Sequence, residues 1–290
     1  MHFLLLKIAS SVGMGLVLKH ADARGLPRLP VIRVNYAVAA VLAFFGALAL
    51  RQTHLSLGTG LLGAVTGALF VAGLLCWSKT IEAAGLALSV VAMRTAIVVP
   101  VFLSVLLWRE RPTALELAGS GVALAALGLV LAGVVRRAAP GDARPHRGNA
   151  PFWLAALFVV DGLVVTAAQV FRQELPQDEN LPFQAIIFTS AFVLTSLLYW
   201  LRRQQVSRDA LRFGGVLGAA NLGNYLFLVL ALSVLPGVVV YPVIAAGEVG
   251  LMAVAGIFIW RERLRPLSWA GIALAVLALV LIQLGRASGG

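Results

Sequence analysis

Arg94, Asp161 and Glu248 are the residues of this 290-residue sequence best suited to chemistry, because each stands alone inside a long apolar run. A guanidinium holds a carboxylate or a phosphate through two parallel hydrogen bonds, whereas a carboxylate binds an amine or carries a proton. A charge at the centre of an apolar helix in lipid costs about 2.5 to 3.5 kcal/mol. We therefore expect each of the three to pair with another group or to line a polar cavity.

The composition predicts that these runs lie in a bilayer. Hydrophobic residues make up 60% of the chain, charged residues 12%, and the mean hydropathy is +0.95, whereas soluble proteins have about 25% charged residues. Our prediction is a multi-pass integral protein of the bacterial inner (cytoplasmic) membrane. The four histidines are far apart in the sequence and Cys76 is the only cysteine, which argues against a zinc site or an internal disulfide. No cofactor and no metal are predicted.

Ten apolar runs are long enough to be membrane-spanning helices of about 20 residues. The first contains Lys7 and shows no convincing cleavage site, so we expect a span rather than a removable signal sequence. The runs are roughly 3–18, 31–50, 57–77, 86–107, 114–135, 152–171, 184–201, 213–235, 238–260 and 266–284.

The sequence contains one unit written twice. Residues 108–111 (WRER) return at 260–263, an offset of 152, and the same offset matches Pro30 with Pro182 and Gly85 with Gly237. Residues 1–135 and 150–290 are the two predicted five-helix repeats, and 136–149 is a polar linker. Because each repeat has an odd number of spans, the second must enter the membrane from the opposite side. The predicted fold is an all-α integral membrane protein with ten transmembrane helices, arranged as two inverted repeats around a central cavity.

Positive charge is unevenly distributed among the predicted loops. Loops after odd-numbered helices hold sixteen Lys and Arg, whereas loops after even-numbered helices, with the C-terminal tail, hold five. The positive-inside rule then places both termini outside the cytoplasm. The net charge of +11 indicates attraction to an anionic lipid surface rather than to nucleic acid.

The face of the predicted ninth helix that carries Glu248 also carries Tyr241, seven residues earlier. Pro242 lacks an N–H group, which changes the backbone hydrogen bonding of that helix. The repeat counterpart of Glu248 is residue 96, two positions from Arg94, so an ion pair between Arg94 and Glu248 is expected. Glu248 either serves a substrate amine or a coupled proton, or it is a structural partner of another helix.

Further candidate residues lie on other predicted helices. Asp161 occurs in one repeat only, and its alternative role is an internal hydrogen bond. Asn221, Asn224 and Tyr225 form one polar stripe, which suits a polar ligand or contacts between helices. The residues predicted at a gate or cavity rim are Lys19, Asn35, Tyr36, Trp77 and Pro242, of which Tyr36 and Trp77 could instead be interface anchors.

Small residues four apart predict close helix packing in the third and eighth predicted helices. The pairs are Gly63 with Gly67 and Gly215 with Ala219, and Gly119 is also interpreted as a packing residue.

Residues 102–133 (FLSVLLWRERPTALELAGSGVALAALGLVLAG) and 258–285 (FIWRERLRPLSWAGIALAVLALVLIQLG) resemble the end of each EamA-type repeat of the drug/metabolite transporter superfamily. Glu110 and Glu262 match the family's turn Glu, and Glu248 matches a Glu that many members carry fourteen residues before that turn. Lys19 followed by Asn35 and Tyr36 resembles a subset of the family. The resemblance implies transport of small molecules and, contrary to the charge count, cytoplasmic termini. A reporter that is active only in the cytoplasm, fused after Gly290, distinguishes the two orientations.

The predicted function is a secondary transporter that moves a small polar metabolite, zwitterionic or anionic, by alternating access. Gradient drive is expected, by proton coupling or exchange, because the sequence has no Walker-type phosphate loop. A metabolite exporter fits this prediction, and an enzyme does not, because no nucleophile, base or metal set converges. The expected partners are a small-molecule substrate and the lipid bilayer, without nucleic acid, and a monomer is compatible with the sequence. The alternative is a structural or lipid-handling membrane protein that does not transport.

Overall fold

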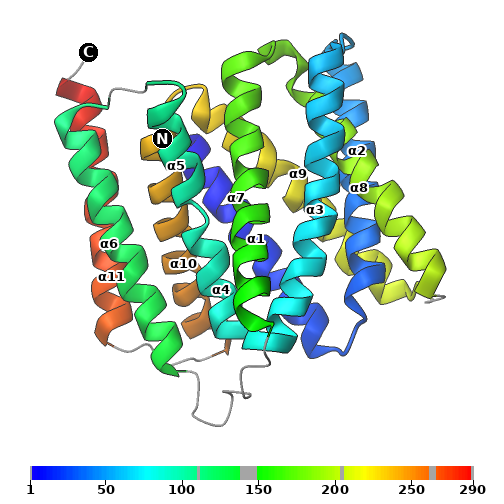
Figure 1. The fold of residues 1–290 in the computed structure, drawn as a ribbon, viewed down its shortest axis with the longest axis horizontal. Helices are drawn as coiled ribbons and strands as arrows, with labels where there is room; N and C mark the ends of the chain where they lie inside the picture. Colours follow the sequence, from blue (N-terminus) through cyan, green and yellow to red (C-terminus); the bar gives the residue numbers. More distant parts are fainter. Residues whose placement is uncertain (1, 110–111, 138–148, 203–205, 261–265, 289–290) are drawn as a thin grey trace. The chain divides into compact units, whose positions relative to one another are not determined.

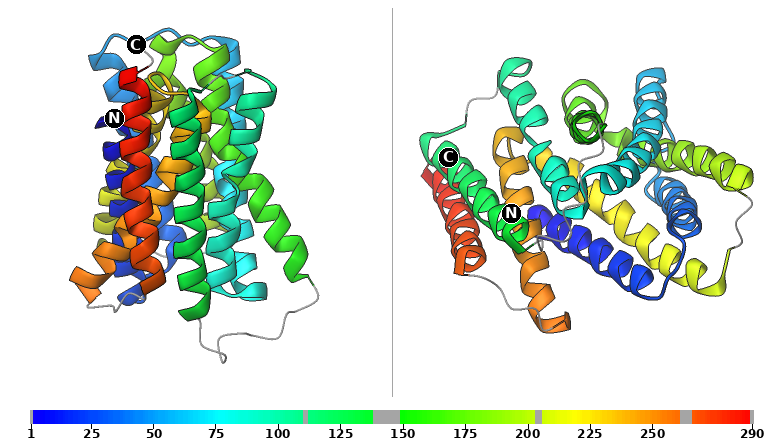
Figure 2. Two further views of the ribbon diagram at one scale, coloured as in Figure 1. Left: turned by 90° about the vertical axis from the view of Figure 1, so that its left-hand side faces the viewer. Right: turned by 60° about the horizontal axis from the view of Figure 1, so that its bottom comes forward.

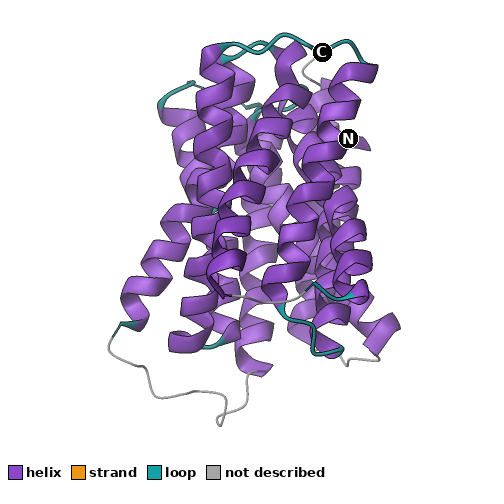
Figure 3. Ribbon diagram, turned by 90° about the vertical axis from the view of Figure 1, so that its right-hand side faces the viewer, coloured by secondary structure: helices purple, strands orange, loops and turns teal. Residues whose placement is uncertain are grey.

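The computed structural model describes residues 2–109, 112–137, 149–202, 206–260 and 266–288. Within these ranges the chain is helical with short connections and contains no strand (Figure 3). The helices are α1 (His2–Ala23), α2 (Arg28–Ala49), α3 (Leu57–Ala84), α4 (Leu86–Thr95), α5 (Val98–Leu106), α6 (Ala114–Arg137), α7 (Ala150–Glu174), the 3-10 helix η1 (Gln177–Glu179), α8 (Asn180–Arg202), α9 (Arg208–Leu232), α10 (Gly237–Trp260) and α11 (Pro266–Ser288). The all-α prediction is confirmed for the part of the chain described.

Within the described ranges, seven helical segments are long and apolar enough to cross a bilayer. Three further apolar helices have shorter described runs, at Ala114–Leu129, Gly237–Met252 and Trp269–Ile282. Large apolar side chains are exposed on several helices, for example Phe45 on α2 and Trp200 on α8. Such exposure is typical of helices that face acyl chains rather than water. The chain therefore has the helices of a multi-pass membrane protein.

The run predicted as a single helix over 86–107 is broken between α4 and α5 at Ala96 and Ile97. Pro100 explains the break, because it has no N–H to donate to the carbonyl of Ala96, four residues earlier. The N–H of Val99 donates to that carbonyl instead, at 3.0 Å. The tighter turn ends α4 directly after Thr95 and places Arg94 in its last turn.

The chain forms two compact units, and each unit combines segments from both halves of the sequence. Unit 1 contains residues 72–169 and 231–290, and unit 2 contains residues 2–71 and 170–230. The predicted repeats are continuous stretches of sequence, whereas each unit is a set of segments that pack together. The repeats themselves therefore stay a prediction about sequence organisation.

Within each unit, a helix packs against the helix at the matching position of the other predicted repeat. In unit 1, α6 and α11 lie side by side and run in opposite directions (Figures 1 and 2). In unit 2, α2 and α8 lie side by side and also run in opposite directions (Figure 1). The offset of 152 carries residue 114, where α6 begins, to 266, where α11 begins, and residue 28 to 180 in the same way. In these two pairs, the matching helices are packing partners.

Glycines allow close helix packing in unit 2, partly at the predicted positions. A Cβ on Gly67 would meet the Ile187 carbonyl and would lie 2.7 Å from Cβ of Ser190, so α3 packs closely on α8 as predicted. The prediction for Gly215 is wrong, because a Cβ there would have nothing within 4 Å. Gly218 on α9 makes the close approach instead, and its Cβ would lie 2.6 Å from the carbonyl oxygen of Asn35 on α2. Residue spacing indicated a packed stripe, but not which stripe of α9 faces α2.

We expect Gly67→Ala to lower the free energy of unfolding by about 1 to 3 kcal/mol, because the new methyl group would force α3 away from α8. The matched control is Gly215→Ala, which fills open space. It should leave stability unchanged or raise it by up to about 1 kcal/mol, as Ala favours a helix over Gly. Thermal unfolding of both variants in detergent measures the difference, and equal stability of the two variants would contradict the assigned packing.

Candidate functional site

Arg94 and Glu248 form an ion pair inside unit 1. Nη1 of Arg94, in the last turn of α4, donates to Oε2 of Glu248, in the middle of α10. The side chain of Glu248 is 4% exposed and that of Arg94 is 31% exposed. The structure thus brings together the two charges that the repeat offset predicted to meet.

The break after α4 positions Arg94 for this contact. A cation in the last turn of a helix is stabilised by the unsatisfied carbonyl groups at that end. The repeat counterpart of Glu248 is Ala96, which is a break residue. At this pair of matching positions, the first predicted repeat has the break at Ala96 and the second has the Glu248 carboxylate.

Tyr241 and Pro242 lie two turns before Glu248 on α10, and both are buried. The Tyr241 hydroxyl donates to Oε1 of Gln169 at 3.2 Å and lies 3.4 Å from the Val165 carbonyl oxygen. These contacts hold α10 against α7. Gln169 is 1% exposed and was missed by sequence reasoning, because a lone amide near a helix end gives no signal of its own.

Asp161 lies half-buried on α7, at the level where that helix packs on the α4 to α5 break. The next residue, Gly162, makes this close packing possible. A Cβ on Gly162 would lie 2.8 Å from Cγ2 of Val99 and 3.3 Å from the Ala96 carbonyl oxygen. Trp77, in the part of α3 that belongs to unit 1, is also half-buried.

Unit 2 holds the predicted amides. Nδ2 of Asn221 on α9 donates to Oδ1 of Asn35 on α2 at 3.2 Å, and both residues are buried. Asn35, predicted at a gate or cavity rim, is buried within unit 2, where this amide pair joins two helices. Lys19 is exposed near the end of α1.

An aromatic cluster surrounds Tyr225 in unit 2. Its members have ring centroids 5.9 to 6.4 Å apart and are Tyr36, Phe70, Phe183, Phe188 and Tyr225. Tyr36 is buried in this cluster, and its place at a gate or cavity rim stays a prediction. The phenylalanines were not predicted, because single aromatic residues in apolar helices carry no distinguishing spacing.

Two polar atoms on α9 are buried without a hydrogen-bond partner among the described residues. They are the Tyr225 hydroxyl and Oδ1 of Asn224. A buried polar group without a partner costs about 1 to 3 kcal/mol, so a polar ligand or a water would be stabilised there. Asn224 and Tyr225 thus keep the binding potential that their sequence pattern indicated.

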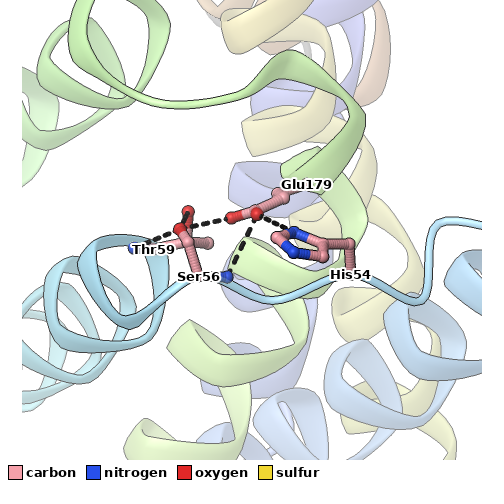
Figure 4. Close-up of polar contacts among 4 residues, drawn as sticks. All are labelled: His54, Ser56, Thr59 and Glu179. Atoms are coloured by element: carbon pink, nitrogen blue, oxygen red, sulfur yellow. Dashed lines mark hydrogen bonds and ion pairs between the residues drawn. The ribbon is translucent and has the colours of Figure 1, made fainter.

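Figure 4 shows a third polar group, which sequence reasoning missed, around the fully buried Glu179 in unit 2. Oε1 of Glu179 accepts from the Ser56 N–H at 3.0 Å and contacts Nδ1 of His54 at 2.5 Å, and Oε2 accepts from the Ser56 hydroxyl at 2.7 Å. The Ser56 oxygen also accepts from the Thr59 N–H at 3.3 Å. Ser56 before an apolar helix was a readable capping signal, but its carboxylate partner is 123 residues away. The group closes the start of α3 against η1.

No group of three His, Cys, Asp or Glu side chains is placed to hold a metal ion within the described ranges. Glu110 and Glu262, the predicted turn residues, lie outside those ranges.

Comparison with known proteins shows likeness of fold. No family model matches the sequence. An uncharacterized protein of Haemophilus influenzae is 23% identical over 288 residues, which cover 96% of each chain. A protein of known crystal structure superposes with a TM-score of 0.77 at 15% identity, over 99% of this chain and 98% of the other. The arrangement of helices is therefore shared with that protein along nearly the whole chain.

We expect Arg94→Gln to lower the free energy of unfolding by about 3 kcal/mol, because Glu248 would stay buried without its guanidinium partner. Glu248→Gln should have a similar effect. The double variant should be less destabilised than the sum of the single variants, because neither charge remains. Denaturation of the four proteins in detergent measures this coupling, and additivity within about 0.5 kcal/mol would show that the pair contributes no coupling energy.

Glu179→Gln should lower the free energy of unfolding by about 2 kcal/mol, because hydrogen bonds to a charged group each contribute about 1.5 to 3 kcal/mol. The neighbouring Asp178 is exposed, so Asp178→Asn is a control with the same charge change and an expected effect below about 0.5 kcal/mol. Thermal melts compare the two variants. A loss in the Asp178 variant as large as in the Glu179 variant would point to net charge instead of the local contacts.

Proposed function

We propose that this chain is a secondary transporter that moves a small zwitterionic or anionic metabolite across a membrane by alternating access. The proposal includes ten spans in two inverted five-helix repeats. The repeat offset supports it, as does the opposite direction of the matching helices α6 and α11, and of α2 and α8. The sequence resemblance to EamA-type members of the drug/metabolite transporter superfamily, and thus a place in the bacterial inner membrane, agrees with this arrangement.

The ion pair between Arg94 and Glu248 is the observation that carries the proposal. A buried ion pair adds little net stability, and apolar residues of similar size can replace such a pair without loss. A chain that served only as a membrane scaffold would not require it. Charged residues inside apolar helices are typical of solute and ion pathways.

The chemistry of the pair indicates the class of solute. A solute carboxylate would compete with Glu248 for the planar donors of Arg94. A solute amine would compete with Arg94 for the Glu248 carboxylate. A zwitterion satisfies both groups when the pair opens, so the exchange leaves neither charge buried alone. This accounts for binding without a large desolvation cost.

Glu248 and Asp161 are the candidates for proton coupling, because both are carboxylates within apolar helices. Protonation would remove the charge of Glu248 and release Arg94 to an anion. Coupling by exchange of two solutes uses the same pair and needs no proton. In the alternative function, a structural or lipid-handling protein, the ion pair between Arg94 and Glu248 has no reason to open.

The test is a thermal-shift screen of the purified protein with neutral amino acids, dicarboxylates, sugars and organic cations. A zwitterionic or anionic compound should raise the melting temperature of the wild type, and Arg94→Gln should abolish that rise. Lys79→Gln is the control, since Lys79 is an exposed cation in the same unit.

Uptake of the stabilising compound into proteoliposomes then tests transport. Glu248→Gln should slow uptake at least tenfold, because the variant cannot exchange the partners of Arg94. The exposed Glu82→Gln should transport at the wild-type rate. Unchanged uptake in Glu248→Gln, or a compound that binds without being taken up, would refute the transporter proposal.

A further inference from the structure

Arg33 on α2 is held by one stripe of α8, in unit 2. Its Nε–H donates to the Ser196 hydroxyl at 2.9 Å. The guanidinium carbon lies 4.6 Å from the ring centroid of Tyr199 and 5.4 Å from that of Phe192. A guanidinium between two rings and a hydroxyl is fixed in position, because cation–π contacts and a hydrogen bond act together.

This cation has no anionic partner in the part of the chain that the structure describes. No carboxylate there pairs with Arg33, and no acceptor lies on its terminal nitrogens. Arg28, by contrast, is paired with Asp22 at 2.8 Å. Arg33 therefore presents oriented N–H donors of the kind that bind a phosphate or a carboxylate in a bidentate manner.

If α2 and α8 span a bilayer, the positions of these donors near the helix ends correspond to headgroup depth. Arg33 lies five residues after the start of α2, about 7 to 8 Å along its axis. Tyr199 lies three residues before the end of α8, and tyrosines commonly lie at the level of lipid headgroups. The long Arg side chain can also reach toward that level.

An exposed apolar stripe on α8 runs beside the residues that hold Arg33. It consists of Val193, Leu197, Trp200 and Leu201, whose exposed fractions range from 55% to 73%. The spacing of four, three and one residues places these side chains along one side of the helix. A phospholipid whose acyl chain lies on this stripe would have its phosphate near the end of α8, where Arg33 is held.

The end of unit 2 at which α2 begins and α8 ends is basic. Its described cations are Lys19, Arg24, Arg28, Arg33, Arg208 and Arg212, and its acidic residues are Asp22 and Asp209. Each basic residue near an anionic membrane surface contributes about 1 kcal/mol of attraction. The surroundings of Arg33 therefore favour a lipid with net negative charge over a zwitterionic lipid.

We propose that Arg33, Ser196 and Tyr199 form a binding site for the phosphate of an anionic phospholipid, whose acyl chain lies on the exposed stripe of α8. Arg33 binds the phosphate, Ser196 fixes the guanidinium plane, and Tyr199 covers one side of it. This site is independent of the transport proposal, since it uses none of the residues assigned to the solute.

The test measures lipid retention by native mass spectrometry of the full chain in detergent, titrated with phosphatidylglycerol. Arg33→Gln should lower phosphatidylglycerol affinity by about tenfold, in line with the loss of contacts to one charged group. Arg212→Gln is the matched control, because Arg212 is an exposed cation at the same end of unit 2 that already has Asp209 beside it, so its loss should change affinity less than twofold. Ser196→Ala keeps every charge and should lower affinity by about threefold.

Two further measurements distinguish a lipid phosphate from a soluble one. Phosphatidylcholine should bind the wild type at least fivefold more weakly than phosphatidylglycerol does. Inorganic phosphate alone, at millimolar concentration, should neither displace the lipid nor raise the melting temperature. Equal phosphatidylglycerol retention by Arg33→Gln and the wild type would overturn the site, and displacement by inorganic phosphate would show a soluble anion site instead. If Arg33→Gln does not fold, unchanged affinity in Ser196→Ala overturns the proposal.

Discussion

A charge inside an apolar helix must have a partner, and this constraint determines how unit 1 is built. Glu248 lies in the middle of α10, so the cation that pairs with it has to approach from a neighbouring helix. Pro100 breaks the helix directly after Thr95, which places Arg94 at a helix end where its charge is favoured. Tyr241 and Gln169 fix α10 against α7 two turns away. A proline, an ion pair and one hydrogen bond between helices are thus parts of a single arrangement.

The two units hold polar groups of different kinds. Unit 1 contains a buried ion pair, whereas unit 2 contains an amide pair, aromatic rings and a buried carboxylate that contacts Ser56 and His54. Within each unit, positions related by the offset of 152 also differ in their polar residues, since the counterpart of Glu248 is Ala96 and that of Glu179 is Pro27. At positions matched by this offset, α6 packs on α11 and α2 packs on α8, whereas the polar residues at matched positions differ.

The sequence predicted those features that depend on local pattern. Apolar runs indicated the helices, and the offset of 152 predicted the pairing of Arg94 with Glu248. Features that depend on distant partners were missed. Neither Glu179 nor Gln169 has a local signal, because the groups they bind lie 123 and 72 residues away. The error at Gly215 has another cause: adjacent residues differ by about 100° around a helix, and spacing alone does not say which direction faces a neighbour.

The capping carboxylate of α3 has a consequence for synthesis. Ser56 and His54 leave the ribosome long before Glu179 does, since 123 residues separate Ser56 from its partner. At a synthesis rate of about 5 to 20 residues per second, roughly 6 to 25 seconds pass between the synthesis of Ser56 and that of its acceptor, Glu179. Water or a chaperone must satisfy those donors during translation. Assembly of unit 2 is therefore completed only after the second half of the chain emerges, which makes this contact a marker of late maturation.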